Sequence, residues 1–275
     1  MNEPYDYIIA GAGAAGLSLA YHLVQAGLRE ERILLLDRAP KTANDRTWCF
    51  WEVGEGSFEK VVFRKWSQIW FYGEGISKQL VIAPYAYKMI RGLDFYQFMN
   101  RWVSEQPNIR VRYGEISYLT EREGGVEVGL EGQTLRGRWA FSSLYQPPPR
   151  NLRDHYLLQH FKGWVIRTPG PAFDTEAATF MDFRVAQQGA VRFGYVLPFD
   201  ARTALVEYTL FSPELLWPEE NDAGLRESLE VILALSSYEA LEAEFGITPM
   251  TDAPFPRRQS AHIVNIGMAG GRTKA

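Results

Sequence analysis

The apolar positions at the start of the chain change their spacing twice. Residues 5–10 form a short, mostly apolar run typical of a strand. Glycines follow at positions 11, 13 and 16, and apolar residues then recur at helical steps as far as Leu28. A second apolar run, residues 33–36, ends at Asp37. The pattern predicts a strand, a tight turn, a helix and a second strand, in that order.

Strand-like stretches dominate the rest of the chain. We expect strands over residues 65–72, 80–90 with a break at Pro84, 109–111, 164–166, 178–183, 191–197, 204–211 and 263–266, and a hairpin over 126–139. Helical spacing predicts a helix over residues 93–105 and a long helical region over 219–245, broken near residues 236–237. Residues 147–149 are three prolines, which suit a stiff crossing between domains.

These elements indicate an α/β protein, in which an FAD/NAD(P)-binding domain of the Rossmann type carries a second domain built on a mixed β-sheet. We assign residues 1–60, 88–158 and 250–275 to the FAD-binding domain. We assign residues 61–87 and 159–249 to the substrate-binding sheet domain.

The glycines at the first turn have the spacing G-x-G-x-x-G, and each has a physical role. Gly11 allows the sharp turn out of the strand, Gly13 lets a diphosphate approach the backbone, and Gly16 lets the helix pack closely on the sheet. The helix N-terminus presents unpaired N–H groups to that diphosphate. Asp37 stands where a carboxylate can accept hydrogen bonds from a ribose. The position of the motif at the start of a long chain favours FAD over NAD.

Composition excludes some classes of function. The formal net charge is −4, which disfavours a nucleic-acid binder. Cys49 is the single cysteine, so no internal disulfide and no cysteine-built metal site is expected, and a reducing, cytoplasmic compartment fits. No stretch has the apolar length of a membrane-spanning helix. The 8 Trp, 14 Tyr and 16 Phe fit either a well-filled core or a large apolar ligand. Trp48 and Trp51 either line a cavity or plug the core.

Several segments, spread over essentially the whole chain, resemble those of one family. The resemblance is to the flavin-dependent lycopene cyclases of carotenoid biosynthesis, close to the bacterial β-cyclases. It rests on residues 11–16, 45–51, 87–95, 159–164, 181–183, 246–250 and 267–274. Thr248 is an insertion relative to the Ile-Pro-Met-type segment of that family. The glycine loop after residue 266 continues in full-length members, whereas this sequence stops at Ala275, and we therefore expect that a C-terminal part is missing.

The resemblance places the catalytic acid at Glu207, within the family's Leu-Glu-x-Thr-like strand motif. Alternation along residues 204–211 puts Glu207 beside Leu205, Thr209 and Phe211 on a largely apolar strand face. A carboxyl group in such a place stays protonated to higher pH and is suited to general acid catalysis. The alternative is a glutamate on an exposed strand face.

The resemblance further implies a non-redox cyclisation of lycopene and related linear carotenoids to β-rings, with reduced FAD bound and NAD(P)H serving only as reductant. Because the substrate dissolves in membranes, peripheral membrane association is expected, without metal or nucleic acid. The implied residues are Gly11, Ala12, Gly13, Ala14, Ala15, Gly16, Asp37, Arg46, Gly267, Gly270 and Gly271 for the cofactor, and Trp48, Trp51, Asp182 and Phe183 for the substrate pocket.

Two other functions remain open from the sequence. A redox flavoenzyme, either a monooxygenase or an isoprenoid reductase, would need the same N-terminal unit. The chain would alternatively be an inactive fragment that at most binds a dinucleotide.

Overall fold

A computed structural model describes residues 3–148, 151 and 153–272, and the chain divides into two compact units. Unit 1 comprises residues 1–43, 93–149 and 253–275, and unit 2 comprises residues 44–92 and 150–252. Residues 44–60 and 88–92, which we had placed with the FAD-binding domain, group with unit 2. The pairing of β3 (Thr47–Val53) with β7 (Tyr85–Arg91) holds them there.

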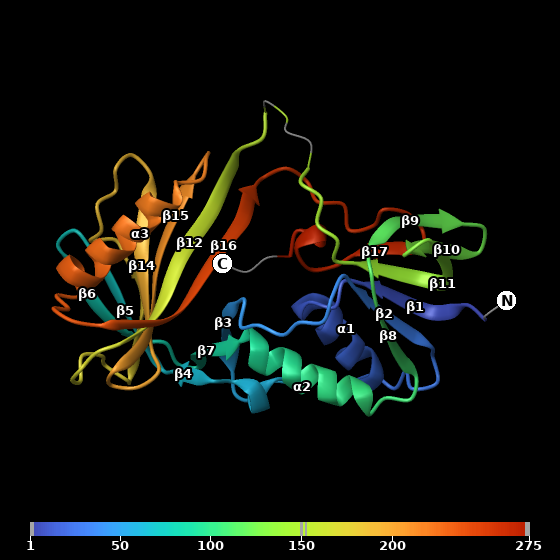
Figure 1. The fold of residues 1–275 in the computed structure, drawn as a ribbon, viewed down its shortest axis with the longest axis horizontal. Coiled ribbons are helices and arrows are strands. Elements are labelled where there is room, and N and C mark those ends of the chain that lie inside the picture. Colours follow the sequence, from blue (N-terminus) through green and yellow to red (C-terminus); the bar gives the residue numbers. More distant parts are fainter. Residues whose placement is uncertain (1–2, 149–150, 152, 273–275) are drawn as a thin grey trace. The chain divides into compact units, whose positions relative to one another are not determined.

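Unit 1 contains one seven-stranded sheet with the order β8-β2-β1-β11-β10-β9, and β17 also pairs with β11 (Figure 1). Its strands are β1 (Tyr5–Ala10), β2 (Ile33–Asp37), β8 (Ile109–Tyr113), β9 (Ile116–Arg122), β10 (Gly125–Leu130), β11 (Gln133–Ser142) and β17 (Ile263–Asn265). The pairs β1–β2, β1–β11, β2–β8 and β11–β17 are parallel, whereas β9, β10 and β11 pair antiparallel. The expected strand–turn–helix–strand unit and the hairpin over residues 126–139 are confirmed.

Three parallel strands of unit 1 end at the same edge of the sheet. Ala10 of β1 pairs with Ser142 of β11, and Ser142 pairs with Asn265 of β17. The segments that follow these three residues therefore leave the sheet side by side. In open α/β sheets the carboxyl edge is where ligands bind.

Helix α1 (Ala14–Gln25) follows β1 and packs on β1 and β2, with Leu17, Ala20 and Val24 buried. Helix α2 (Gly92–Ser104) is the helix expected over residues 93–105. Beneath α1, the apolar side chains of β1 and β2 are fully buried. Burial on both faces explains why these strands read as continuous apolar runs.

Unit 2 contains a second seven-stranded sheet, with the order β16-β12-β15-β14-β13-β5-β6. Its strands are β5 (Gln68–Gly73), β6 (Ile76–Val81), β12 (Tyr156–Arg167), β13 (Ala177–Asp182), β14 (Val191–Pro198), β15 (Thr203–Ser212) and β16 (Glu239–Thr251). A separate three-stranded sheet has the order β3-β7-β4, where β4 is Arg64–Trp66, and a short 3-10 turn (Glu59–Val61) precedes it.

The seven-stranded sheet of unit 2 is covered on both faces. Helix α3 (Pro218–Glu227) and the π-helical turn Ser228–Ile232 cover one face, where Val206 and Tyr208 pack against Leu225 and Leu229. On the other face, side chains of β3, β4 and β7 join Leu197 and Leu205 in a second cluster. Strand β15 is therefore buried from both sides, as its two apolar faces predict.

Two secondary-structure predictions were wrong. The helical region ends at Ile232, and Glu239–Thr251 is a strand. Its Glu, Ala and Leu residues favour a helix locally, but pairing with β12 along nearly the whole strand overrides that preference. The single strand expected over residues 65–72 is two strands, because β4 pairs with β7 whereas β5 pairs with β6 and β13.

Candidate functional site

The glycine turn after β1 is as tight as its spacing predicts. Gly11 has φ +105°, and a Cβ on it would lie 2.0 Å from Ser143 Oγ. A Cβ on Gly16 would lie 1.9 Å from the carbonyl oxygen of Gly11, so only glycine lets α1 approach the turn this closely. At Gly13, by contrast, a Cβ would have no atom within 4 Å. Gly13 thus borders open space.

The N-terminus of α1 opens onto that space. The helix begins at Ala14, and its N-cap residue Gly13 has no side chain to bond the first N–H groups. Unpaired N–H groups and the positive end of the helix dipole favour an anion at this point. The arrangement suits the diphosphate of a dinucleotide.

Asp37 lies at the end of β2, next to the glycine turn. Its Oδ2 accepts the backbone N–H of Ala12 at 2.8 Å, and its Oδ1 accepts the N–H of Arg38 at 2.7 Å. Lys41 donates to Oδ1 at 3.2 Å, a contact that sequence reasoning missed. A small hollow beside Asp37 is lined by apolar and aromatic side chains, among them Leu17, Tyr96 and Tyr113.

The second glycine loop meets the first. The 3-10 turn Gly267–Gly270 follows β17, and a Cβ on Gly267 would lie 2.8 Å from the Cβ of Ala15 in α1. Gly267 and Gly271 both have positive φ, at +56° and +66°. The structure therefore brings residues 11–16, Asp37 and residues 267–271 together within unit 1. Lys274, the last residue of the expected loop, lies outside the described residues.

The remaining predicted cofactor residue, Arg46, lies in unit 2. Its side chain is exposed and pairs with Asp45 at 3.5 Å, and its carbonyl oxygen accepts the N–H of Gly92 at 2.7 Å.

The two predicted pocket tryptophans point to opposite faces of β3. Trp51 shares its face with Thr47 and Cys49, and it packs on Tyr87 and Phe180 at ring-centroid distances of 4.8 and 5.2 Å. Trp48 faces the other way. Of the two, Trp51 therefore belongs to the aromatic cluster under the large sheet.

Asp182 and Phe183 lie where β13 ends. The Asp182 carboxylate is buried and accepts both Nε and Nη2 of Arg184, at 2.8 and 2.5 Å. Phe183 packs on Phe71 and Phe193. The carboxylate of Asp182 is thus engaged by an arginine fork, and Phe183 belongs to a ring cluster.

Glu207 stands in the middle of the large sheet of unit 2. On β15 it pairs with Tyr195 of β14 on one side and with Gly163 of β12 on the other. Paired residues on adjacent strands project to the same face, which here is the face toward β3 and β7. Glu207 keeps a small open surface, yet protein atoms surround it closely, and this burial raises its pKa well above the usual value.

The groups near Glu207 are neutral acids. Burial raises the pKa of the Cys49 thiol and of the Tyr87 and Tyr195 hydroxyls, and the nearby Glu207 carboxyl raises each further. Cys49 and Tyr87 are hydrogen-bonded to each other. The site therefore has little capacity to hold negative charge.

Sequence reasoning missed a second carboxyl group beside Glu207. Glu244 of β16 pairs across the sheet with the same Gly163, and it hydrogen-bonds to Glu207. Burial raises the pKa of Glu244, against the lowering effect of its hydrogen bonds with Glu207 and Thr47. The available signal was the alternation of Glu242, Glu244 and Gly246 in a segment that we had assigned to a helix.

The family model described as lycopene cyclase protein matches residues 6–274. The chain belongs to the lycopene cyclase family. This confirms the resemblance inferred from the sequence segments. The lycopene beta-cyclase of Pseudescherichia vulneris is 24% identical over 229 residues, which are 82% of this chain and 55% of that protein. The chain thus spans about half the length of this curated relative.

Solved structures share the fold of this family member at low identity. A geranylgeranyl bacteriochlorophyll reductase-like protein from Thermoplasma acidophilum matches with TM-score 0.70 and 12% identity, over 98% of this chain and 72% of its own. The halogenase PltM in complex with FAD matches with TM-score 0.65 and 12% identity, over 98% and 64%. The flavin-dependent brominase Bmp2 matches with TM-score 0.64 and 12% identity, over 98% and 72%. These likenesses confirm the predicted α/β fold of the Rossmann type.

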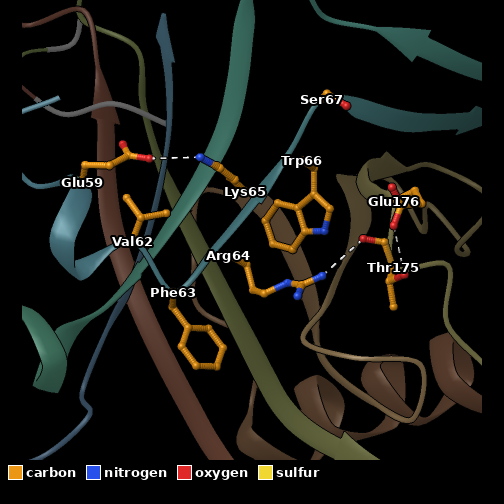
Figure 2. Close-up of a pocket in the computed structure, with 9 residues that line it drawn as sticks. All are labelled: Glu59, Val62, Phe63, Arg64, Lys65, Trp66, Ser67, Thr175 and Glu176. Carbon is orange, nitrogen blue, oxygen red and sulfur yellow. Dashed lines mark hydrogen bonds and ion pairs between the residues drawn. The ribbon is translucent and has the colours of Figure 1, made fainter. Parts of the chain in front are cut away.

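A wide, open hollow of this lycopene cyclase family member lies elsewhere in unit 2. Its volume is about 440 Å³, and Figure 2 shows its lining: Glu59, Val62, Phe63, Arg64, Lys65, Trp66, Ser67, Thr175 and Glu176. Among the described residues, Arg64 Nε and Trp66 Nε1 have no hydrogen-bond acceptor. Neither Glu207 nor a residue of the glycine loops lines this hollow, so we assign it no part in the candidate site.

Two searches of the described residues gave no result. No helix there combines the length and apolarity needed to cross a membrane. In the same part of the chain, no group of three or more His, Cys, Asp or Glu side chains is arranged to hold a metal ion.

Proposed function

We propose that this chain catalyses the acid-initiated cyclisation of the ψ end groups of lycopene to β-rings, giving γ-carotene and β-carotene, without net oxidation or reduction. Membership in the lycopene cyclase family supports the substrate class. The observation that carries the proposal is Glu207, a closely surrounded carboxyl group with a strongly raised pKa on a face lined by aromatic and apolar side chains.

The residues of unit 1 fit the cofactor that this function requires. Residues 11–16 and the start of α1 would hold the diphosphate of FAD, Asp37 would accept the ribose hydroxyls, and residues 267–271 would close the second side. The open space at Gly13 is the observation that supports this fit. A bound, reduced flavin would supply negative charge that stabilises a cation, with NAD(P)H needed only to reduce it.

Glu207 would act as the proton donor. Its O–H bond breaks as a C–H bond forms at the terminal double bond of the substrate, which leaves a tertiary carbocation. The polyene closes the ring, and loss of a proton from the ring restores a double bond. The numbers of atoms and electrons in substrate and product are therefore equal. A carboxyl group that stays protonated at neutral pH is the kind of acid this step needs.

The aromatic cluster beside Glu207 would protect the cation. Trp51, Tyr87 and Phe180 pack together on the face that Glu207 shares. Ring faces attract a positive charge, most strongly where water is excluded. Exclusion of water would also keep the cation from being captured as an alcohol.

We further propose that the protein reaches its substrate from a membrane surface, as a cytoplasmic, peripherally bound protein. Lycopene is a hydrocarbon that dissolves in the bilayer. Before α3, Trp217 is 75% exposed and Leu215 is 45% exposed, which is unusual for large apolar side chains. Flotation with phosphatidylcholine/phosphatidylglycerol vesicles tests this: Trp217→Ser should weaken binding, while Val191→Ser, at another exposed apolar position, should not. Equal loss in both variants would argue against the surface.

Expression in lycopene-accumulating cells, followed by pigment analysis, tests the main proposal. The chain should convert lycopene to ring-bearing carotenoids. Glu207→Gln should retain flavin absorbance but lose ring formation by roughly 100-fold or more. Glu214→Gln, at an exposed glutamate after β15, is the matched control and should keep activity. Cyclisation by Glu207→Gln would remove Glu207 from its role.

Nicotinamide consumption separates this function from a redox flavoenzyme. A cyclase oxidises far less than one NAD(P)H per ring formed, whereas a monooxygenase or isoprenoid reductase oxidises one per product. Stoichiometric oxidation would end the cyclase proposal. A soluble protein that binds no flavin and forms no ring would instead be an inactive fragment.

A further inference from the structure

The two glutamates of the site meet because the strand between them has no side chain at the crossing point. Glu207 on β15 and Glu244 on β16 both pair with Gly163 of the middle strand, β12. A Cβ on Gly163 would lie 2.9 Å from Glu207 Cγ and 3.1 Å from Glu244 Cγ. Any larger residue there would stand between the two side chains.

The hydrogen bonding of Glu244 leaves room for one particular partner. Thr47 Oγ1 donates to Glu244 Oε2 at 2.9 Å. Glu244 Oε1 is buried, and within the described chain no standing N–H or O–H donor reaches it. Glu207 is within hydrogen-bonding reach of Glu244, but it can donate only when it carries a proton. A protonated Glu207 therefore completes the hydrogen bonding that Glu244 otherwise lacks.

The surroundings favour one proton on this pair. Cys49 of β3, Tyr87 of β7 and Tyr195 of β14 face Glu207, and none of them is a cation. On the other side, Asp45 and Glu242 add negative charge near Glu244. Two ionised carboxylates in contact would repel each other strongly in such a place.

Glu244 is also the member of the pair closer to solvent. It lines a hollow of about 10 Å³, together with Thr47, Arg91 and Glu242. This volume is near the size of a single water molecule. Glu207 does not line that hollow.

We propose that Glu244 is the positioning residue that keeps Glu207 protonated: as a carboxylate held by Thr47, it accepts the proton-bearing oxygen of Glu207 across Gly163, so that the two groups share one proton. This inference rests on the proposed role of Glu207 as the acid. Glu244 acts through Glu207 and need not touch the substrate.

Infrared pH titration of the intact protein, with no substrate present, tests the pair directly. The carbonyl band of a protonated carboxyl group should persist above neutral pH in the wild type and disappear in Glu207→Gln. In Glu244→Gln the negative partner is gone, so the band of Glu207 should be lost at least about one pH unit lower. Titration of the band at the wild-type pH in Glu244→Gln would overturn the proposal.

A glycine pair supplies a second test with no change of charge. Gly163→Ala places a methyl group between the carboxyls and should move the band in the same direction as Glu244→Gln. Gly194→Ala, on the adjacent strand β14, meets no atom closer than 3.6 Å and should leave it in place. Equal shifts in both alanine variants would mean a general disturbance of the sheet and would count against the pair.

The pH profile of cyclisation links the pair to activity. Glu244→Gln should lose activity on the alkaline side at least about one pH unit earlier than the wild type, and keep most of it on the acid side. Glu239→Gln, an exposed site on the same strand, should not shift the profile. A uniform loss at every pH would refute the positioning role. A band that behaves as expected in a protein with no cyclase activity would refute the proposed function and leave the pair intact.

Discussion

Asp37 at the end of β2 bonds the backbone N–H of Ala12 through its carboxylate, over 2.8 Å, and so ties the glycine turn to the neighbouring strand. Asp37→Ala removes this bond together with those from Arg38 and Lys41. We expect a loss of about 1–3 kcal/mol in the free energy of unfolding, because each orphaned buried donor costs up to that amount. Flavin affinity should fall as well. Urea unfolding and flavin titration measure the two effects.

Asp37→Asn is the conservative partner of that variant. It keeps one carbonyl oxygen as an acceptor but loses the charge and the second acceptor. Its stability should lie between those of the wild type and Asp37→Ala. A stability for Asp37→Asn below that of Asp37→Ala would contradict the role of the carboxylate as an acceptor.

Two glycines three positions apart should respond in opposite ways to the same added methyl group. Gly16→Ala forces a Cβ to within 1.9 Å of a carbonyl oxygen and should destabilise unit 1 whether or not flavin is present. Gly13→Ala meets no protein atom within 4 Å, so its stability should match the wild type while flavin binding falls. Thermal unfolding without flavin, followed by flavin titration, distinguishes them. Full flavin affinity in Gly13→Ala would place the diphosphate elsewhere.

The raised pKa of Glu207 should make the protein less stable as the solution becomes more alkaline. The folded protein holds this proton at pH values where the unfolded chain has released it, so this contribution is complete below about pH 4.5 and is lost as pH rises toward the folded pKa. The slope is at most about 1.4 kcal/mol per pH unit. Glu207→Gln cannot lose a proton there, and its stability should exceed that of the wild type by an amount that grows with pH. Urea midpoints over a pH series measure this, and parallel curves would contradict it.

Lys88 of β7 should matter for stability more than other surface-side lysines. Its side chain is 1% exposed, and its ammonium group bonds Glu52, Glu59 and the carbonyl oxygen of Gly54. Lys88→Met leaves both carboxylates without their cation. Because these partners enclose Lys88 near the periphery of unit 2, we expect the lower end of the range for broken buried pairs, roughly 3 kcal/mol.

Lys65→Met is the matched control for this prediction. Lys65 pairs with the same Glu59 at 3.3 Å, but its side chain is 62% exposed. Its loss should cost less than about 1 kcal/mol. Similar unfolding midpoints for the two variants would show that enclosure of Lys88 adds nothing.

The features that were predicted from sequence are those that depend on neighbours along the chain. The glycine turn, α1 and Asp37 form one continuous stretch, and each has a local reason that a single sequence displays. The break at Pro84 and the strand around Glu207 were visible for the same reason, since alternation along β15 reveals both of its faces.

The features that were missed depend on pairing between distant strands. Residues 239–251 contain good helix formers, and only the partner strand β12 makes them a strand. Glu244 and Thr47 meet through that same pairing, so neither could be connected to Glu207 from spacing. Gly163 looked unremarkable within its strand, because the two side chains that need its empty position come from either side of it.

The common edge shared by Ala10, Ser142 and Asn265 has a consequence for synthesis. The chain leaves the ribosome from its N-terminus, and the strand that carries Asn265 is the last of the three to emerge. All of unit 2 is made in between. The nascent chain must therefore keep the first two strands waiting, with one side of the nucleotide cradle open, until translation has passed residue 265. Contacts of such long sequence separation form slowly, so loading of the cofactor becomes a late, post-translational event.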